Sequence, residues 1–123
     1  MPILDIEIVL RPGEALPPSL AADLAAAAAE AMGASPGRTW VKLSRLAAED
    51  YAEDGAGPAE PVYPIFVRVL KAQRPTGAEL QVEALRLTEA IARACNRPVA
   101  NVHVLYEPHA EGRLAFGGQL VLG

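Results

Sequence analysis

The chain contains the same strand–helix–strand pattern twice. Pro2 and Pro36 are 34 positions apart, and so are Pro64 and Pro98. Pro-Ile opens both copies, and Arg-Pro ends the first strand of each, at residues 11–12 and 74–75. Self-similarity of this kind indicates a duplicated structural unit. A βαβ unit holds its two strands parallel and places the connecting helix on one face of the sheet, so the duplication strongly restricts the possible folds.

The first copy covers about residues 1–54. Alternating apolar and acidic residues predict a strand from about residue 3 to 10. A helix is expected from about residue 18 to 32, with Ser19 as its N-cap and Gly33 as its stop. Residues 39–43 are expected to form the second strand. The predicted buried stripe of the helix is Leu20, Leu24, Ala27 and Ala31.

A Gly- and Pro-rich linker near residues 52–61 separates this copy from the second, which covers about residues 62–123. The pattern predicts a strand from about residue 63 to 70, a helix from about 78 to 95 and a strand from about 101 to 106. The helix is expected to bury Val82, Leu85, Thr88, Glu89 and Ala92.

Two joined βαβ units predict a single α+β domain: a four-stranded mixed sheet with both helices on one face. If the first strands of the two copies pair antiparallel at the centre, Pro2 lies beside Lys71 and Arg74. The same pairing brings Pro64 next to Arg11, but Pro64 is an internal amide and cannot act as a base. We therefore expect one active and one inactive site per chain, with Arg11 at the inactive one.

Composition restricts the kinds of partner and cofactor. The 123 residues carry a net charge of −4 and no sustained basic stripe, which argues against a nucleic-acid partner. The apolar stretch over residues 20–32 contains Asp23 and Glu30 and is too short to cross a membrane. A single cysteine, Cys95, favours a reducing cytoplasm and a packing role. The two histidines, His103 and His109, lack the supporting ligands of a metal site, so no metal or cofactor is expected.

Pro2 is the residue with the most unusual chemistry. If Met1 is removed, Pro2 carries a secondary amine, which is the only form in which a proline nitrogen can accept a proton. An unperturbed α-amino group has a pKa of roughly 8. Burial and nearby cations lower the pKa of an amine, because both disfavour its charged form. Lys71 and Arg74 would supply the cations, while Trp40 and Phe116 would supply apolar walls.

These features together resemble the tautomerase superfamily. Pro2 opens a βαβ strand, the unit is duplicated, an arginine ends the first strand, and Phe116 precedes two glycines near the C-terminus. The resemblance covers nearly the whole chain. It is strongest to the long, internally duplicated members, such as 5-carboxymethyl-2-hydroxymuconate isomerase and fused 4-oxalocrotonate tautomerase. It implies a homotrimer in which the N-terminal proline is a general base and cationic side chains hold a substrate carboxylate.

The resemblance also implies individual roles. The Lys71–Arg74 spacing is similar to paired cations in the isomerase and in cis-3-chloroacrylic acid dehalogenase. Trp40 and His103 stand where the short tautomerase has an arginine in its second strand. The residues expected to act are Pro2 and Arg74 in catalysis, and Lys71, Arg74, His103, Trp40 and Phe116 in substrate binding.

Three functions stay open at this level. The first is a cofactor-free keto–enol tautomerase that acts on an enol or unsaturated keto acid. The second is a hydratase, dehalogenase or decarboxylase of a three-carbon acid. No acidic residue is assigned as the water-activating carboxylate of the dehalogenases, and Glu107 and Glu111 are the remaining candidates. The third is a non-catalytic, ferredoxin-like binding module, because βαββαβ is also the element order of that fold. A trimer is further expected because Ile65, Phe66, Val67, Val69 and Leu70 put apolar residues on both faces of a strand. The segment from residue 116 to 121 is expected to reach a neighbour.

Overall fold

The computed structural model describes residues 2–55 and 61–122. Met1 and residues 56–60, which belong to the expected linker, lie outside this described part. The first unit contains β1 (Ile3–Val9), α1 (Leu20–Met32) and β2 (Trp40–Leu46), followed by the short 3-10 helix η1 (Ala48–Asp50). The second contains β3 (Ile65–Leu70), α2 (Gly77–Cys95), the 3-10 helix η2 (Val99–Asn101) and β4 (Val102–Tyr106). A small hairpin of β5 (Ala115–Phe116) and β6 (Gln119–Leu120) follows.

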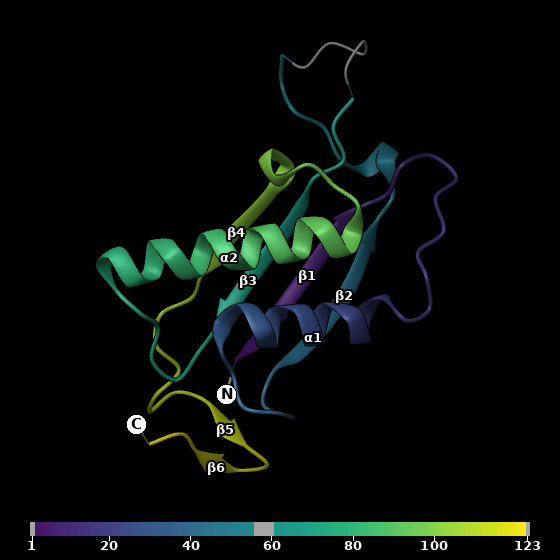
Figure 1. Cartoon of the computed structure of the whole chain (residues 1–123). Coiled ribbons are helices and arrows are strands. Elements are labelled where there is room, and N and C mark those ends of the chain that lie inside the picture. The colour runs from purple at the N-terminus through teal and green to yellow at the C-terminus, as the bar shows by residue number, and fades with distance from the viewer. Residues whose placement is uncertain (1, 56–60, 123) are drawn as a thin grey trace.

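The sheet has the order β2-β1-β3-β4. The central pair, β1 and β3, is antiparallel with Ile3 opposite Leu70, and each outer strand is parallel to its neighbour. Both helices lie on the same face of this sheet (Figure 1). The predicted α+β fold and the predicted antiparallel central pairing are therefore confirmed. The start of β1 lies beside the end of β3, as the pairing requires.

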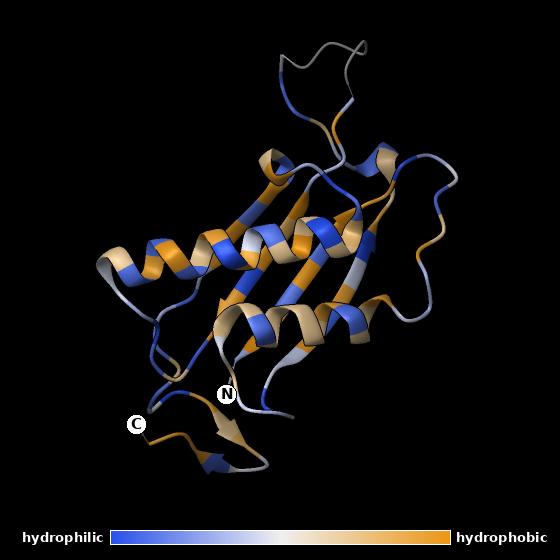
Figure 2. Cartoon of the chain, in the orientation of Figure 1, coloured by the Kyte–Doolittle hydropathy of each residue, from blue (hydrophilic) through white to orange (hydrophobic). Residues whose placement is uncertain are grey.

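The core lies between the two helices and the sheet. Alternate residues of the strands point into it, which gives the banded strands in Figure 2. Burial of each such aliphatic side chain stabilises the fold by about 1.5–3 kcal/mol. The fully buried core residues are Leu4, Ile6, Ile8, Leu24, Ile65, Val67, Val69, Leu87 and Ile91.

Helix α1 ends as predicted but begins two residues later than expected. Gly33 stops it in the left-handed conformation, with φ of 62°. Ser19 occupies the N-cap position but makes no capping bond to the backbone; its hydroxyl donates to Asp23 instead. The buried side is Leu20, Leu24 and Ala28 rather than the predicted stripe through Ala27. Strand β2 also continues further than expected, to Leu46.

The predicted buried stripe of α2 is wrong in register except at Ala92, which is buried. Val82 and Leu85 are about half exposed, at 47% and 52%. The helix instead buries a series spaced by four residues that begins at a charged position. A strongly apolar residue at 82 or 85 is not decisive, because the face toward the sheet is set by the whole helix. The buried residues of α2 are Glu83, Leu87, Ile91, Ala92 and Cys95.

The sheet face opposite the helices is mixed rather than apolar. Ion pairs join Lys42 to Asp5 at 2.9 Å and Arg68 to Glu107 at 2.9 Å. Phe66 is 38% exposed, whereas its neighbours Ile65 and Val67 face the core. Strand β3 does carry apolar residues on both faces, with Phe66 and Leu70 on this one, and Arg68 lies between these two. No helix in the described part of the chain is long and apolar enough to span a membrane.

Candidate functional site

Pro2 lies at the start of β1, beside the C-terminal end of α1. The residue is buried, and its carbonyl accepts a 3.0 Å hydrogen bond from the backbone N–H of Trp40. A hollow of about 460 Å³ opens next to it. The hollow is lined by Pro2, by residues 32–35 and Arg38 of the loop after α1, and by Lys71 at the end of β3. Pro2 and Lys71 therefore share one site, as the antiparallel pairing predicts.

The loop after α1 lines one side of this hollow. Gly33 and Ala34 donate backbone hydrogen bonds to Glu30 and Ala29, at 3.2 and 2.9 Å, which closes the helix in a Schellman-type motif. The left-handed conformation of Gly33 is disfavoured for residues with a Cβ, so glycine suits this stop. The next side chain is only a methyl group. Space next to Pro2 is left open because Ala34 cannot fill it.

Lys71 forms an ion pair with Glu83 of α2. Its Nζ lies 2.7 Å from Oε1 of Glu83, and Oε2 of Glu83 accepts a 2.7 Å hydrogen bond from the hydroxyl of Tyr106. The side chains of Lys71 and Glu83 are only 18% and 10% exposed. Burial of the Tyr106 hydroxyl, reinforced by the Glu83 carboxylate, raises the pKa of Tyr106 well above its usual range. Tyr106 is therefore a hydrogen-bond donor at neutral pH.

Arg74 lies three residues beyond Lys71 and does not line the hollow in the described part of the chain. Its backbone N–H donates to Nδ1 of His109 at 3.0 Å. Its side-chain Nε is buried with no hydrogen-bond partner among the described residues. The structure thus places Lys71, and not the guanidinium of Arg74, beside Pro2. The catalytic role expected for Arg74 stays a prediction.

The other expected binding residues surround the site less closely. Trp40 pairs with Ile3 in the sheet, and its ring contacts Phe116 edge to face with 5.1 Å between centroids. Neither aromatic residue lines the hollow. His103 pairs with Phe66 near the opposite end of the sheet, with 5.6 Å between their rings. Within one chain, the structure does not bring His103 to Pro2.

Sequence reasoning missed two residues of the site. Arg38 lines the hollow from the loop after α1. A signal for it was present, since this loop must end beside the start of β1 in any βαβ unit. Glu83 is 9% exposed although it is charged. Its signal was the four-residue spacing to Leu87 and Ile91, which places an acidic residue on the buried side of a helix.

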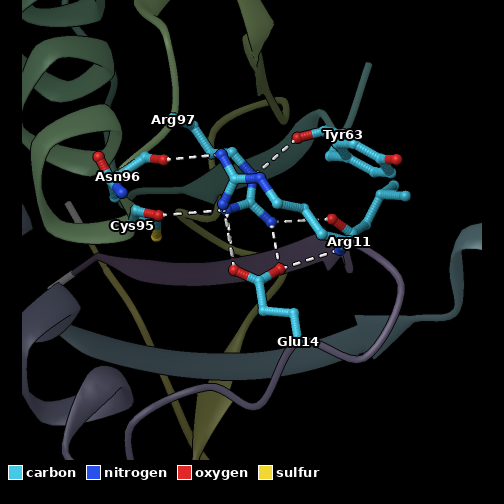
Figure 3. Close-up of polar contacts among 7 residues, drawn as sticks. Arg11, Glu14, Tyr63, Cys95, Asn96 and Arg97 are labelled. Carbon is cyan, nitrogen blue, oxygen red and sulfur yellow. Dashed lines mark hydrogen bonds and ion pairs between the residues drawn. The ribbon is translucent and has the colours of Figure 1, made fainter. Parts of the chain in front are cut away.

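At the opposite end of the sheet, Pro64 is fully buried. Arg97, 5% exposed, occupies this end (Figure 3). Its guanidinium donates to the carbonyls of Tyr63 and Val9 at 2.9 and 3.0 Å. It also forms a two-pronged pair with Glu14, at 2.7 and 3.1 Å.

Arg11 belongs to this second cluster, as predicted. It contacts Glu14 at 3.3 Å and the carbonyl of Asn96 at 3.3 Å (Figure 3). The hydrogen bond from Arg97, aided by Arg11, lowers the pKa of Glu14 to about 2 in spite of the opposing effect of burial. Burial raises the pKa of the nearby Cys95 thiol to about 11. Cys95 is thus a core residue with a protonated, poorly nucleophilic sulfur.

Residues 2–55 and 61–122 contain no group of three or more His, Cys, Asp or Glu side chains arranged to hold a metal ion. The titratable groups of the Pro2 hollow are instead Lys71 and Arg38. This donor set suits an anion, since ammonium and guanidinium groups pair with carboxylates.

No family model and no curated protein sequence matches the chain. Solved structures do resemble it. A fused 4-OT, solved as an asymmetric trimer, is 23% identical, covers 94% of both chains and has a TM-score of 0.70. Pt0534 inactivated by 2-oxo-3-pentynoate is 16% identical, covers 96% of this chain and 95% of that one, and has a TM-score of 0.72. MIF2 of Leishmania major is 18% identical, covers 98% and 97%, and has a TM-score of 0.68.

The chain therefore has the fold of the tautomerase superfamily, in the internally duplicated form that fused 4-OT represents. The likeness extends over almost the whole chain, so both βαβ units take part in it. The resemblance inferred from the sequence is confirmed at the level of the fold.

Proposed function

We propose that the protein is a cofactor-free tautomerase that isomerises an enol or unsaturated keto acid with Pro2 as general base. One observation supports this most directly: Pro2 and Lys71, distant in sequence, line one hollow at the start of the central strand. Removal of Met1 would make the Pro2 nitrogen an amine within this hollow.

The proposed base is matched to its task by its surroundings. The Arg38 guanidinium in the same hollow and the burial of Pro2 both disfavour a charged amine and lower its pKa toward neutrality. A base with a pKa near the working pH is the most effective one for proton transfer. The neutral Pro2 nitrogen takes the proton from the enol hydroxyl and then, as the ammonium, returns a proton to carbon. The net reaction is ketonisation without change in composition.

The cations of the hollow bind the acid group of the substrate. Arg38 can hold a carboxylate with two parallel hydrogen bonds, and Lys71 can stabilise the negative charge that develops on the enolate oxygen. Arg74 is proposed to add to the positive potential near this site from the adjacent loop. Trp40 and Phe116 are proposed to shield the entrance.

We propose that the protein works as a cytoplasmic homotrimer. A fused 4-OT structure that resembles this chain is an asymmetric trimer, and another is a symmetric one. His103 lies on the sheet face opposite the helices, so it can join a Pro2 site only from a neighbouring copy. Light scattering that gave a stable monomer at micromolar concentration would remove this part of the proposal.

The test of function combines activity with covalent labelling. Intact mass first establishes whether Pro2 is the terminus of the purified protein. The trimmed protein should ketonise phenylenolpyruvate or a 2-hydroxy-2,4-dienoate, with a rising pH limb near neutrality as Pro2 loses its proton. It should also be inactivated by 2-oxo-3-pentynoate, the reagent that inactivates Pt0534. The amine would add to the alkyne of the reagent, so peptide mapping should find one reagent molecule on Pro2.

The other two functions predict different outcomes. A hydratase, dehalogenase or decarboxylase would leave enol acids unchanged while it converts a halogenated acrylate or malonate semialdehyde. A ferredoxin-like binding module would keep Met1 and show neither turnover nor labelling. Either result would overturn the tautomerase proposal.

A further inference from the structure

The carboxylate of Glu83 is the one buried acidic group in contact with a residue of the Pro2 hollow in the described part of the chain. It accepts hydrogen bonds on both oxygens, one from Lys71 and one from Tyr106. Tyr106 cannot supply a charge of its own, because burial keeps its hydroxyl protonated. The ammonium of Lys71 is therefore compensated by one full negative charge.

Arg38, the second cation of the hollow, is in a different situation. Its side chain is exposed, and it makes no ion pair with any residue of the described segments. With Pro2 neutral, as a base must be, the charges of Lys71 and Glu83 cancel. The positive charge of Arg38 is then the only uncompensated one that lines the hollow.

We propose that Glu83 determines the substrate class of the Pro2 site: it neutralises Lys71 so that the site prefers monocarboxylates to dicarboxylates. The inference rests on the proposed function in taking this hollow as the substrate site. An unpaired Lys71 ammonium would attract a dianion about twice as strongly as a monoanion, and pairing with Glu83 removes most of this attraction. The tight pairing also fixes the Lys71 ammonium at one position on the wall of the hollow.

Glu83→Gln separates charge from shape. Glutamine has the same size and can still accept a hydrogen bond from Tyr106, but it leaves the Lys71 ammonium uncompensated. Affinity for anions should rise, and it should rise more for dianions. Lys71→Gln is the opposite change, since it leaves the Glu83 charge without its partner. That variant should disfavour dianions even more than the wild type does.

The experiment measures binding rather than turnover. Trimmed protein is titrated with cinnamate, a monocarboxylate, and with trans,trans-muconate, a dicarboxylate, at fixed pH and ionic strength. Backbone amide NMR shifts of Gly33, Ala34 and Lys71 locate both ligands. The ratio of dicarboxylate to monocarboxylate affinity should rise about three- to tenfold in Glu83→Gln.

Two controls distinguish the site from general effects. Glu79→Gln removes the same charge from an exposed position one turn earlier on α2 and should leave the ratio within about twofold of the wild type. Tyr106→Phe removes a hydrogen bond but no charge, so it should not raise the ratio. A structural defect would lower the affinity for both ligands to the same extent. The proposal instead requires the ratio of dicarboxylate to monocarboxylate affinity to change.

An unchanged ratio in folded Glu83→Gln would overturn the inference. If that variant did not fold, a ratio in Lys71→Gln equal to or above that of the wild type would overturn it as well. Wild-type protein that bound neither anion at Gly33 and Ala34 would do the same. If the anions bind there but no enol acid is turned over, the tautomerase proposal fails while the ratio still decides the role of Glu83.

Discussion

The two ends of the antiparallel pair β1 and β3 have similar backbone structure, but different side chains pack at each end. At one end, Pro2 lies beside a hollow of about 460 Å³. At the other, Pro64 is fully buried next to the guanidinium of Arg97. The repeat thus produced two equivalent positions: one borders a hollow, and a buried guanidinium packs beside the other.

A single side chain accounts for much of this difference. Ala34 and Arg97 each follow a left-handed residue that ends a helix, with φ of 62° at Gly33 and 54° at Asn96. Each donates its backbone N–H to the carbonyl five residues earlier, at 2.9 and 3.0 Å. The two positions are therefore equivalent in backbone structure. A methyl group at one leaves the hollow open, and a guanidinium at the other fills the space.

Both ends also use an acidic residue to hold a buried cation. Glu83 holds Lys71 at 2.7 Å, and Glu14 holds Arg97 at 2.7 Å. Burial of a charge is costly unless it is paired and hydrogen-bonded. At the Pro64 end the pair satisfies backbone carbonyls and has a structural role. At the Pro2 end the same kind of pair forms one wall of a site.

The largest effect is expected from Pro2→Ala. The variant keeps a terminal amine but loses the ring nitrogen, with its geometry and basicity, so kcat/KM for phenylenolpyruvate should fall about 10²- to 10³-fold. Steady-state kinetics on trimmed protein measures this. Arg11→Ala is the control from the other end and should change kcat/KM less than about threefold. If Arg11→Ala were the more damaging change, the distinction between the two ends would be wrong.

Arg97→Ala should destabilise the fold by about 3–4 kcal/mol. It leaves the partly buried Glu14 without its main partner and removes donors from the carbonyls of Tyr63 and Val9. Urea denaturation monitored by circular dichroism measures the change. Arg93→Ala, at an exposed position in the last turn of α2, should cost less than about 1 kcal/mol. Equal losses in the two variants would show that the Arg97 cluster is not a structural element.

The comparison also shows where sequence reasoning reached its limit. The repeat predicted the sheet, the antiparallel central pair and the separation of Arg11 from Pro2. It did so because strand pairing follows from topology and does not require knowledge of side-chain positions. Arg97 and Glu83 were missed because a charged residue is normally assigned to the surface. Their burial depends on partners, Glu14 and Lys71, that are remote in sequence and visible only after folding.

The sequence predicted the positions of some residues near Pro2 better than those of others. Lys71 lines the hollow because it directly follows β3. Arg74 does not line it, and its backbone N–H bonds to His109 in the loop that follows; the roles expected for both residues stay predictions. The short spacing between two cations does not determine where a loop directs the second one.

Glu14→Gln should reduce the stability of the fold at neutral pH and flatten its dependence on acid. The folded-state pKa of Glu14 is about 2, against a reference value of 4.5. A lowered carboxyl pKa contributes stability above about pH 4.5 that is lost as the pH falls toward 2. With allowance for its 19% exposed side chain, this amounts to about 2–3 kcal/mol.

The measurement is urea denaturation at a series of pH values from 6 to 2. Wild-type protein should lose about 2–3 kcal/mol more than Glu14→Gln across this interval. Glu89→Gln, an exposed substitution on α2, should follow the wild-type curve. Parallel curves for wild type and Glu14→Gln would show that Glu14 is not responsible for the acid response.

Ala34→Arg tests whether the two ends are interchangeable. An arginine after Gly33 should extend into the hollow as Arg97 does beside Pro64, because the backbone at the two positions is the same. No acidic partner equivalent to Glu14 awaits it, so the guanidinium is expected to fill the hollow incompletely. Substrate should be hindered rather than fully excluded, with KM raised about tenfold and kcat reduced less. Labelling of Pro2 by 2-oxo-3-pentynoate should slow by a similar factor.

Ala26→Arg adds the same charge at an exposed position of α1 and should leave both rates unchanged. If Ala34→Arg bound and reacted like the wild type, the small side chain at position 34 would not be what keeps the Pro2 end open.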